Sequence, residues 1–446
     1  MKKNLTTGSV LKTMIYFLFP YFLSYFLQTL YGMADLFIIG QFNSVESTTA
    51  VSIGSQVMHM LTVMIVGLAM GTTILIGRAI GGKQRKLVSL TIGNTITLFA
   101  VTSVFLTAVL LLLTKPIVAI MSTPVEAVSD TILYLRICFI GIPFITAYNV
   151  ISSIFRGMGD SKSPMYFIAV ACVANIVLDY LLIGMFGLGA IGAALGTTIS
   201  QTISVLISLF VIVRQKNDIE VSIKDLLPCR KTMLELLKIG LPVSLQDGFI
   251  QVAFIVITVI ANKRGLNDAA AVGIVEKVIG ILFLVPSSML STVSSLSAQN
   301  IGAGKHERVR LILRYAFIMA VSWGILAVIV MQLTAESFIG LFTGSVEVII
   351  LGSQYMRGYV WDCIFAGIHF SFSGYFCAYG LSSISFIHNF LSIICVRIPL
   401  AYFTSHVYTN TLLPMGLASP VGSMVSVIIC ICAFCWLNKK YKKEKV

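Results

Sequence analysis

The chain has 446 residues, of which 57% are hydrophobic and only 11% charged, with a formal net charge of +13. Soluble globular proteins keep about a quarter of their residues charged, so this composition excludes an ordinary soluble protein. The positive charge does not indicate nucleic-acid binding, because it lies in short segments between long apolar stretches.

Apolar stretches long enough to cross a bilayer recur along the whole chain. A membrane helix requires about 20 mostly apolar residues to cross roughly 30 Å of hydrocarbon. We therefore predict an all-α integral membrane protein of about twelve transmembrane helices. The predicted helices, in chain order, are 13–40, 50–76, 88–113, 131–154, 164–184, 191–213, 238–262, 270–298, 311–333, 349–378, 386–407 and 418–437. The first stretch is too long for a signal-peptide core and is kept as helix one.

The distribution of basic residues predicts the orientation. With both termini in the cytoplasm, 24 of the 31 Lys and Arg residues fall on the cytoplasmic side, 3 fall on the opposite side and 4 lie within helices. Cytoplasmic loops carry such an excess of Lys and Arg in multi-pass proteins. We therefore expect a multi-pass protein of the cell (plasma) membrane with both termini cytoplasmic.

The two halves of the chain repeat short motifs in the same order. The matched pairs are Phe19-Pro20 with Leu241-Pro242, Arg78–Lys83 with Gln299–Lys305, and Phe155–Gly157 with Ala378–Gly380. Six helices per half give both halves one orientation, so the axis relating them runs along the membrane normal. We predict an N-terminal six-helix lobe (1–213), a cytoplasmic linker (214–237) and a C-terminal six-helix lobe with a basic tail (238–446).

Catalytic and nucleotide-binding patterns are absent or incomplete. Residues 77–83 fit the phosphate-loop pattern G-x-x-x-x-G-K, but Gln84 replaces the Ser or Thr that magnesium needs, and a hydrophobic helix precedes the loop. We find no G-x-S-x-G, no H-E-x-x-H and no C-x-x-C in a polar setting. We therefore predict that the protein is not an enzyme, and keep a membrane-bound lipid-modifying enzyme as an alternative.

Two aspartates lie within predicted transmembrane helices, where an ionised side chain is energetically unfavourable. Asp35 and Asp179 each stand five residues before the predicted outer end of an outward-running helix, so they lie at one depth. Thr197 in helix six reaches a similar depth, and Asn175 lies one turn below Asp179 on the same face. Ionisable residues within the bilayer are functional candidates by default. We predict an ion-coupling cluster of these four residues.

The cluster suits exchange of a small cation. Burial and a neighbouring like charge both favour the protonated carboxyl, so the pair can exchange a proton. The same oxygens of Asp35 and Asp179 are alternatively ligands for Na⁺, and no other metal or cofactor is expected. The competing interpretation is that both aspartates reach solvent at the outer interface. Tyr31 and Gln28 lie one and two turns below Asp35, and with it they form the predicted substrate cavity.

A second pair of charges lies in the C-terminal half. Asp362 and Arg397 stand near the middle of helices ten and eleven, which are neighbours in sequence. A buried ion pair costs less than two separate buried charges, so we predict a structural salt bridge between them.

The spacing of the polar residues resembles a known family. Asp35 follows Pro20 by fifteen residues, Asn175 and Asp179 form N-x-x-x-D, and Thr197 follows eighteen residues later. In this pattern the chain resembles the multidrug and toxic compound extrusion (MATE) family, in its DinF-like branch, over nearly its whole length. The resemblance implies drug efflux driven by protons or sodium, with helix one bending at Pro20 as the ion site changes state.

The chain departs from another branch of that family. That branch has a Glu eight residues after the helix-seven Pro, where this chain has Ile250, and an Asp in helix ten where it has Ile368. The resemblance therefore assigns no ion site to the C-terminal half.

These observations lead to one functional hypothesis and two alternatives. We expect a monomeric secondary antiporter that exports amphipathic, often cationic, drug-like compounds by alternating access, with no nucleic-acid partner. A lipid-linked oligosaccharide or lipid flippase is the first alternative, although such a protein should have a cationic cavity and the predicted site is acidic. The lipid-modifying enzyme is the second.

Overall fold

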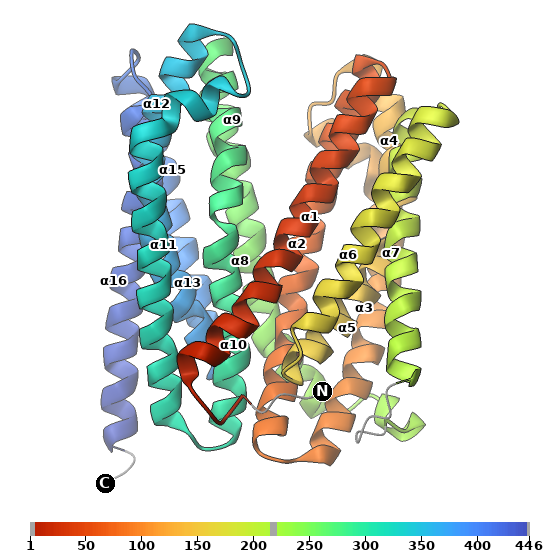
Figure 1. Cartoon of the computed structure of the whole chain (residues 1–446), viewed down its shortest axis with the longest axis vertical. Helices are drawn as coiled ribbons and strands as arrows, with labels where there is room; N and C mark the ends of the chain where they lie inside the picture. Colours follow the sequence, from red (N-terminus) through yellow and green to blue (C-terminus); the bar gives the residue numbers. More distant parts are fainter. Residues whose placement is uncertain (1–4, 215–220, 444–446) are drawn as a thin grey trace. The chain divides into compact units, whose positions relative to one another are not determined.

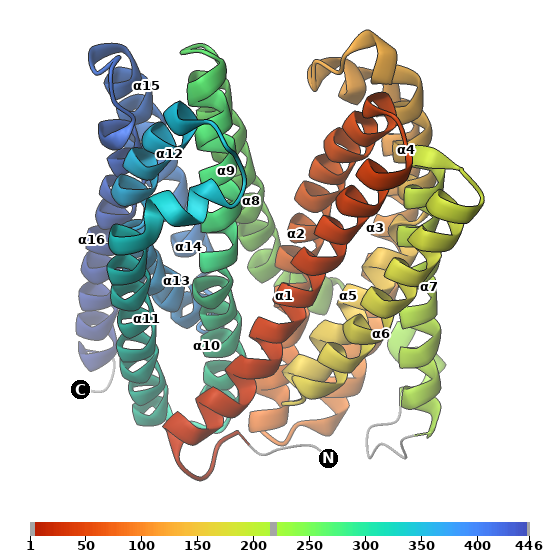
Figure 2. The same cartoon turned by 45° about the horizontal axis from the view of Figure 1, so that its top comes forward.

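The computed structural model describes residues 5–214 and 221–443, with side chains to Lys439, and every regular element in these ranges is helical (Figures 1 and 2). The elements of the first half are α1 (Val10–Phe42), α2 (Val45–Gly81), α3 (Arg85–Ile120), η1 (Val125–Ala127), α4 (Val128–Ile140), α5 (Ile142–Gly157), α6 (Lys162–Asp179), η2 (Tyr180–Met185) and α7 (Gly189–Arg214). Those that follow are η3 (Ile223–Leu226), α8 (Arg230–Asn262), α9 (Leu266–Leu282), α10 (Leu284–Gly302), α11 (His306–Gly340), α12 (Val346–Tyr359), α13 (Asp362–Ala378), α14 (Ser382–Ser392), η4 (Ile393–Arg397), α15 (Ile398–Val407) and α16 (Leu413–Lys443).

The prediction of an all-α membrane protein is confirmed. Ten of the described helical spans are long and apolar enough to cross a bilayer. A bent pair, residues 125–140 and 142–157 at 46°, raises the number to eleven. The remaining predicted helix, 349–378, is present as the two shorter helices α12 and α13.

Proline explains two breaks that the predicted ranges did not contain. Predicted helix 131–154 is broken at Gly141, because Pro143 has no N–H to donate to the carbonyl of Phe139. The Thr107 hydroxyl donates to that carbonyl instead, at 3.2 Å. Predicted helix 270–298 is broken at Phe283 in the same way. Its Pro286 leaves the carbonyl of Leu282 free, and the Trp323 indole N–H donates to it at 3.1 Å.

Two π-helical segments mark further departures from the predicted helices. The segment η2 directly follows Asp179, and η4 ends at Arg397. Pro399 lies two residues after the second segment and has no N–H to donate to the carbonyl of Cys395, four residues earlier. Single π-helical turns occur frequently at functional sites. Asp179 beside η2 and Arg397 at the end of η4 are therefore candidate functional residues.

The chain divides into two compact units. The first comprises residues 15–244 and 298–304, with the residues before Gly8, and the second comprises 8–14, 245–297 and 305–446. Three helices pass from one unit to the other without interruption: α1 between Met14 and Ile15, α8 between Ser244 and Leu245, and α10 between Ser297 and Ala298.

Each unit has its own apolar core. In the first, buried side chains of α2, α4 and α7 pack with the C-terminal part of α1, and a second cluster joins α3, α5 and α6. In the second, one large cluster joins α8, α9, α11, α12 and α16. Many exposed side chains are also large and apolar, as expected for a protein surrounded by lipid.

Glycines at the repeated loop motifs permit close backbone packing within the first unit. A Cβ atom at Gly81 would collide with the carbonyl oxygen of Gln299, and one at Gly302 would collide with that of Arg78. The phosphate-loop-like sequence is therefore the tight end of α2, which continues through Gly82 and a left-handed Lys83 (φ 56°) into α3.

Candidate ion-binding site

The four residues of the predicted ion-coupling cluster come together inside the first unit. Asp35 lies on α1, Asn175 and Asp179 lie in the last turns of α6, and Thr197 lies on α7. Their exposed fractions are 2%, 1%, 0% and 8% in that order. This burial contradicts the competing interpretation, in which both aspartates are exposed to solvent.

The side chains contact one another across the three helices. The Thr197 hydroxyl donates a hydrogen bond to Asp35 Oδ2 at 3.1 Å. The carboxyl of Asp35 also lies within interaction range of Asp179 and Asn175. Two carboxyls, an amide and a hydroxyl thus share one buried site.

Gly196 allows α7 to approach this site closely. A Cβ atom at position 196 would collide with Asp179 Oδ1 and would lie 3.7 Å from Asn175 Nδ2. The absence of a side chain therefore makes room for the acid and the amide of α6. The sequence pattern did not single out Gly196, because its spacing from Asp179 carries no signal without the helix packing.

Several polar atoms of the cluster have no hydrogen-bond partner in the part of the chain that is described. They are Oδ1 of Asp35, both carboxyl oxygens of Asp179, and both side-chain polar atoms of Asn175. Buried polar groups without partners are costly, and such exceptions are frequent where a ligand binds. The free atoms are mostly oxygens, which suit a proton or a hard monovalent cation. No group of three His, Cys, Asp or Glu that could hold a metal occurs among the described residues.

The predicted substrate-cavity residues extend the site along α1. Tyr31 is half-buried and interacts with Asp35, Tyr148 and Gln201. Gln28, also half-buried, interacts with Tyr148 of α5. The polar face of α1 thus continues from the carboxyl cluster for two helical turns toward the N-terminus of the helix.

A buried arginine in the same unit was not predicted as a site residue. Arg156 on α5 is only 6% exposed, and its guanidinium lies 4.2 Å from the centroid of the Tyr21 ring. It also interacts with Tyr25 and Tyr148. No salt bridge joins it to an acid among the described residues. The repeated motif Phe155–Gly157 contains this arginine, but the repeat by itself indicates duplication and not a binding role.

The predicted hinge, Pro20, lies inside α1, which runs as one helix from Val10 to Phe42. The Ser24 hydroxyl donates to the carbonyl of Pro20 at 2.7 Å. The proline itself provides no N–H to the preceding turn, which is the usual cause of a bend in a helix.

The predicted salt bridge between Asp362 and Arg397 is wrong. No ion pair joins them in the second unit, and neither carboxyl oxygen of Asp362 has a hydrogen-bond partner among the residues described. Arg397 donates to the hydroxyl of Tyr359 instead. The π-helical segment η4 is the physical reason, because it changes the register of the helix at Arg397, and equal depth no longer means direct contact.

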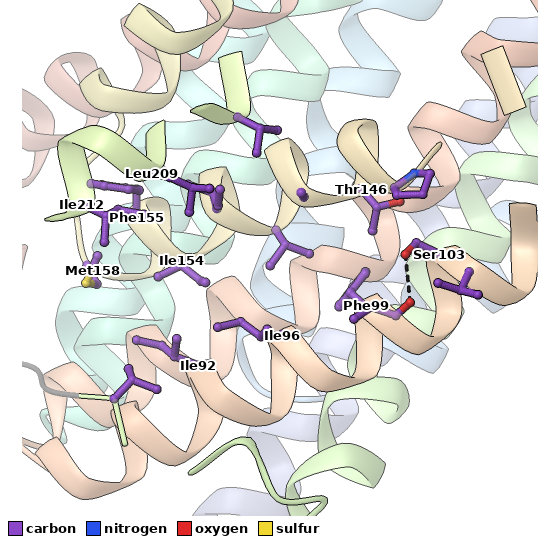
Figure 3. Close-up of a pocket in the computed structure, with 18 residues that line it drawn as sticks. Ile92, Ile96, Phe99, Ser103, Thr146, Ile154, Phe155, Met158, Leu209 and Ile212 are labelled. Atoms are coloured by element: carbon purple, nitrogen blue, oxygen red, sulfur yellow. Dashed lines mark hydrogen bonds between the residues drawn. The ribbon is translucent and has the colours of Figure 1, made fainter. Parts of the chain in front are cut away.

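A cavity of about 600 Å³ in the first unit is separate from the acidic cluster (Figure 3). Side chains of α3, α5 and α7 line it, among them Ile96, Phe99, Ile154 and Leu209, and the lining is almost wholly apolar. None of Gln28, Tyr31 and Asp35 contributes to it.

The fold and site define a multi-pass α-helical membrane protein built from two sequence repeats, with a buried acidic cluster in the first. The MatE family model matches residues 20–181 and again residues 242–403. The chain therefore belongs to the MatE family, and the predicted family resemblance is confirmed.

Comparison with individual proteins agrees with this assignment. The chain is 28% identical to the protein named probable multidrug resistance protein YoeA of Bacillus subtilis (strain 168), over 94% of this chain and 92% of that one. It is 29% identical to the protein named probable multidrug resistance protein YpnP of the same organism, over 89% and 88%. A solved structure described as a multidrug resistance MATE family transporter in an outward-facing conformation has a similar fold, with TM-score 0.90, 24% identity and coverage of 99% and 98%.

Proposed function

We propose that this protein is a secondary active multidrug transporter that exports amphipathic, often cationic, compounds by antiport with protons or sodium. The observation that carries the proposal is the buried, incompletely paired cluster of Asp35, Asp179 and Asn175. Intramembrane carboxyls of this kind occur in proton and ion pathways of transporters. The family membership and the names of the relatives support export of drug-like compounds.

The geometry suggests how ion binding changes the protein. Thr197 of α7 donates to the carboxylate of Asp35 on α1, and a charged acceptor makes a stronger hydrogen bond than a neutral one. Binding of a proton or a cation at the carboxyl pair therefore weakens the link between α7 and α1. α1 contains Pro20, so it can bend once this link is weakened.

The same site favours organic cations as substrates. The carboxylate of Asp35 attracts positive charge, and the ring of Tyr31 beside it provides an aromatic face for a cation. Substrate and coupling ion compete for the carboxylate of Asp35. Antiport then follows in its simplest form, because binding of one displaces the other.

We propose the topology and organisation expected from the sequence as part of this function. Residues 1–213 and 238–446 are the two lobes of an alternating-access transporter, and 214–237 is the cytoplasmic linker. Both termini lie in the cytoplasm of a cell with this protein in its plasma membrane, and the transporter acts as a monomer without catalytic activity. The excess of Lys and Arg on one side supports this orientation.

A lipid-linked oligosaccharide or lipid flippase is the second candidate, and Arg156 is the observation that favours it. A guanidinium that is buried among Tyr21, Tyr25 and Tyr148, with no acid paired to it in the described ranges, can bind a phosphate. The acidic cluster on the same lobe argues against an anionic substrate, so this function ranks second.

The test is efflux of a fluorescent organic cation such as ethidium from proteoliposomes, with proton and sodium gradients imposed separately. We expect uphill transport under at least one gradient, and the effective gradient identifies the coupling ion. Absence of transport under both gradients, together with movement of a fluorescent lipid-linked phosphate between leaflets, would replace drug efflux by the flippase function.

A further inference from the structure

The first unit contains an apolar groove that has no role in the proposed mechanism. It is the cavity of about 600 Å³ described above, lined by α3, α5 and α7 (Figure 3). Both α3 and α7 pack against α5. Lining residues of α5 such as Val150 and Met158 are buried and form the floor, whereas Ile96 and Val104 of α3 and Leu209 of α7 are exposed and form the rims. We call it the lateral groove, because exposed apolar rims of a membrane protein face the hydrocarbon of the bilayer.

The length of the lateral groove matches one leaflet of the bilayer. Along α3 its lining runs from Ile92 to Val104, twelve residues or about 18 Å, in the first half of the helix. The hydrocarbon of one leaflet is about half of the roughly 30 Å of a whole bilayer. Ile92 and Ile212 lie at one end of the groove, and Ser103 and Thr146 lie at the other (Figure 3). One acyl chain can therefore lie along the groove from end to end.

The lateral groove offers little to a polar ligand. The Ser103 hydroxyl donates to the carbonyl of Ala100 at 2.9 Å, and Thr146 Oγ1 has no hydrogen-bond partner among the described residues. The other lining side chains are apolar. An apolar cavity excludes water, and a polar headgroup inside it would lose most of its hydrogen bonds. The ligand that fits the groove is therefore an apolar chain, with any headgroup outside it.

Basic side chains stand at the end of the lateral groove where α3 begins and α7 ends. Arg85 stands two helical turns before Ile92 on the same face of α3. Arg214 is the last residue of α7, and Lys224 of η3 stands three residues after Val221, which also lines the groove. Arg85, Arg214 and Lys224 are exposed, and no salt bridge joins any of them to an acid among the described residues. We call these three residues the basic cluster.

The acids close to the basic cluster in sequence or at the end of α5 make local contacts instead. Asp225 accepts hydrogen bonds from the N–H and the hydroxyl of Ser222, at 2.9 and 3.0 Å. Asp160, in the turn after α5, accepts from the N–H groups of Lys162 and Ser163, at 2.9 and 3.1 Å. The basic cluster is therefore available to an external anion, and Lys and Arg at the membrane surface attract anionic lipid headgroups.

We propose that the lateral groove binds one acyl chain of an anionic phospholipid, whose phosphate contacts the basic cluster. The lipid belongs to the leaflet on the side where α3 begins, which is the cytoplasmic leaflet in the proposed topology. The floor helix α5 also carries Tyr148, which interacts with Tyr31 and Gln28 of the predicted substrate cavity. The bound chain thus packs against a helix that contacts that cavity. Any effect of the lipid on transport rests on the proposed function, whereas lipid binding does not.

The test counts the lipids that the purified full-length protein retains, by native mass spectrometry in detergent. The probes are phosphatidylglycerol, which is anionic, and phosphatidylcholine with the same acyl chains, which has no net charge. We expect one phosphatidylglycerol molecule to be retained at least about tenfold more strongly than phosphatidylcholine, because each basic residue adds to the attraction. Equal retention of the two lipids would overturn the proposal.

Ala100→Trp tests where the acyl chain lies. Ala100 lines the lateral groove and is exposed, so an indole there fills the groove without displacing buried side chains. We expect this variant to lose the tightly retained phosphatidylglycerol. Ala108→Trp is the matched control, because Ala108 is an exposed residue of the same helix that does not line the groove. The same lipid count in both variants would also overturn the proposal.

A triple variant, Arg85→Gln with Arg214→Gln and Lys224→Gln, tests the headgroup contacts. We expect retention of phosphatidylglycerol to fall to that of phosphatidylcholine, whose own retention stays unchanged because the groove is intact. Lys115→Gln, an exposed position near the other end of α3, should keep the wild-type preference. A preference for phosphatidylglycerol that survives in the triple variant would contradict the contact with the basic cluster. If the wild-type protein exports no substrate, the proposed function fails, but the lipid counts still decide whether this site exists.

Discussion

Thr197 and Asp35 are 162 residues apart in sequence, and a hydrogen bond of 3.1 Å joins the hydroxyl of one to the carboxyl of the other. The bond links α7 to α1 between two buried side chains. The strength of this link depends on the charge of the carboxyl, because ionised acceptors bind a hydroxyl more strongly. The state of one acid therefore affects the packing of two helices.

Asp35→Asn should abolish uphill efflux and leave the protein folded and inserted. Asn keeps the shape of the side chain but cannot exchange a proton or offer a full charge to sodium, and removal of a buried charge makes insertion no harder. Each elementary charge crossing 100 mV carries about 2.3 kcal/mol, and this driving force is lost without the exchangeable group. The measurement is efflux from proteoliposomes under a fixed ion gradient.

Asp179→Asn should have the same effect, because the two acids titrate as a pair. Thr197→Val is a milder change that removes one hydrogen bond, and it should slow efflux without uncoupling it. Wild-type rates from a well-expressed Asp35→Asn variant would show that this cluster does not couple ion to substrate.

Gly196→Ala should impair transport by displacing the carboxyl of Asp179. The added methyl group would collide with Asp179 Oδ1. We expect at least a tenfold loss of uphill efflux, about 1.4 kcal/mol, at normal expression. Gly192→Ala on the same helix is the matched control, because its methyl group meets Ile183 and Leu182 at 3.1 Å and approaches neither acid. Equal losses in the two variants would indicate a general packing effect.

Pro20→Ala should slow transport while ion binding persists. Ala is more favourable than Pro in a helix interior by about 3 kcal/mol, so the variant makes α1 harder to bend. Ion binding can be followed by the thermal stability of the purified protein with increasing proton or sodium concentration. Pro116→Ala, inside α3, removes a proline that lies outside the candidate site, and it should leave the transport rate near that of the wild type. A normal rate in Pro20→Ala would exclude a bend at this residue as a required step.

Arg264→Lys should destabilise the second unit. The guanidinium donates to four carbonyls at the end of α15 and the following turn, those of Ser405, Tyr408, Thr409 and Thr411. It also lies 3.4 Å from the carboxyl of Asp268. A lysine ammonium cannot reach this set of acceptors, so we expect a loss of about 2 kcal/mol or more in unfolding free energy.

Denaturant unfolding in detergent measures this loss. The neighbouring Lys263→Ala is the control, because Lys263 is exposed and should change stability by less than about 0.5 kcal/mol. A similar stability for Arg264→Lys and Lys263→Ala would contradict the structural role of the guanidinium.

Local sequence features were sufficient to predict the helices and the residues that meet in the first unit. Apolar length depends only on composition within one segment, and the depth of Asp35, Asp179 and Thr197 follows from counting residues along each helix. The structure brings these side chains together because equal depth on packed helices leaves little freedom. Counting residues along a helix does not show which helices pack together, so the sequence did not identify Gly196 as a site residue.

The errors share a different cause. Prolines also lie inside the unbroken helices α1, α3 and α8, so the presence of a proline alone did not predict the breaks at Gly141 and Phe283. At these two breaks, Thr107 and Trp323 from other helices donate to the carbonyls that the prolines leave free. The predicted pairing of Asp362 with Arg397 assumed regular α-helical register, which η4 does not have. The acceptors of Arg264 lie more than 140 residues away, and no sequence pattern relates them to it.

The two units are joined by helices that continue through the boundary rather than only by loops. The boundary falls inside α1, α8 and α10, and in α8 it lies just after Pro242. A loop changes conformation at little energetic cost. An α-helix resists bending, because bending distorts its backbone hydrogen bonds. Any rearrangement between the units must therefore bend α1, α8 and α10. Because all three helices would have to bend together, the elastic energy of each adds to the cost of such a rearrangement.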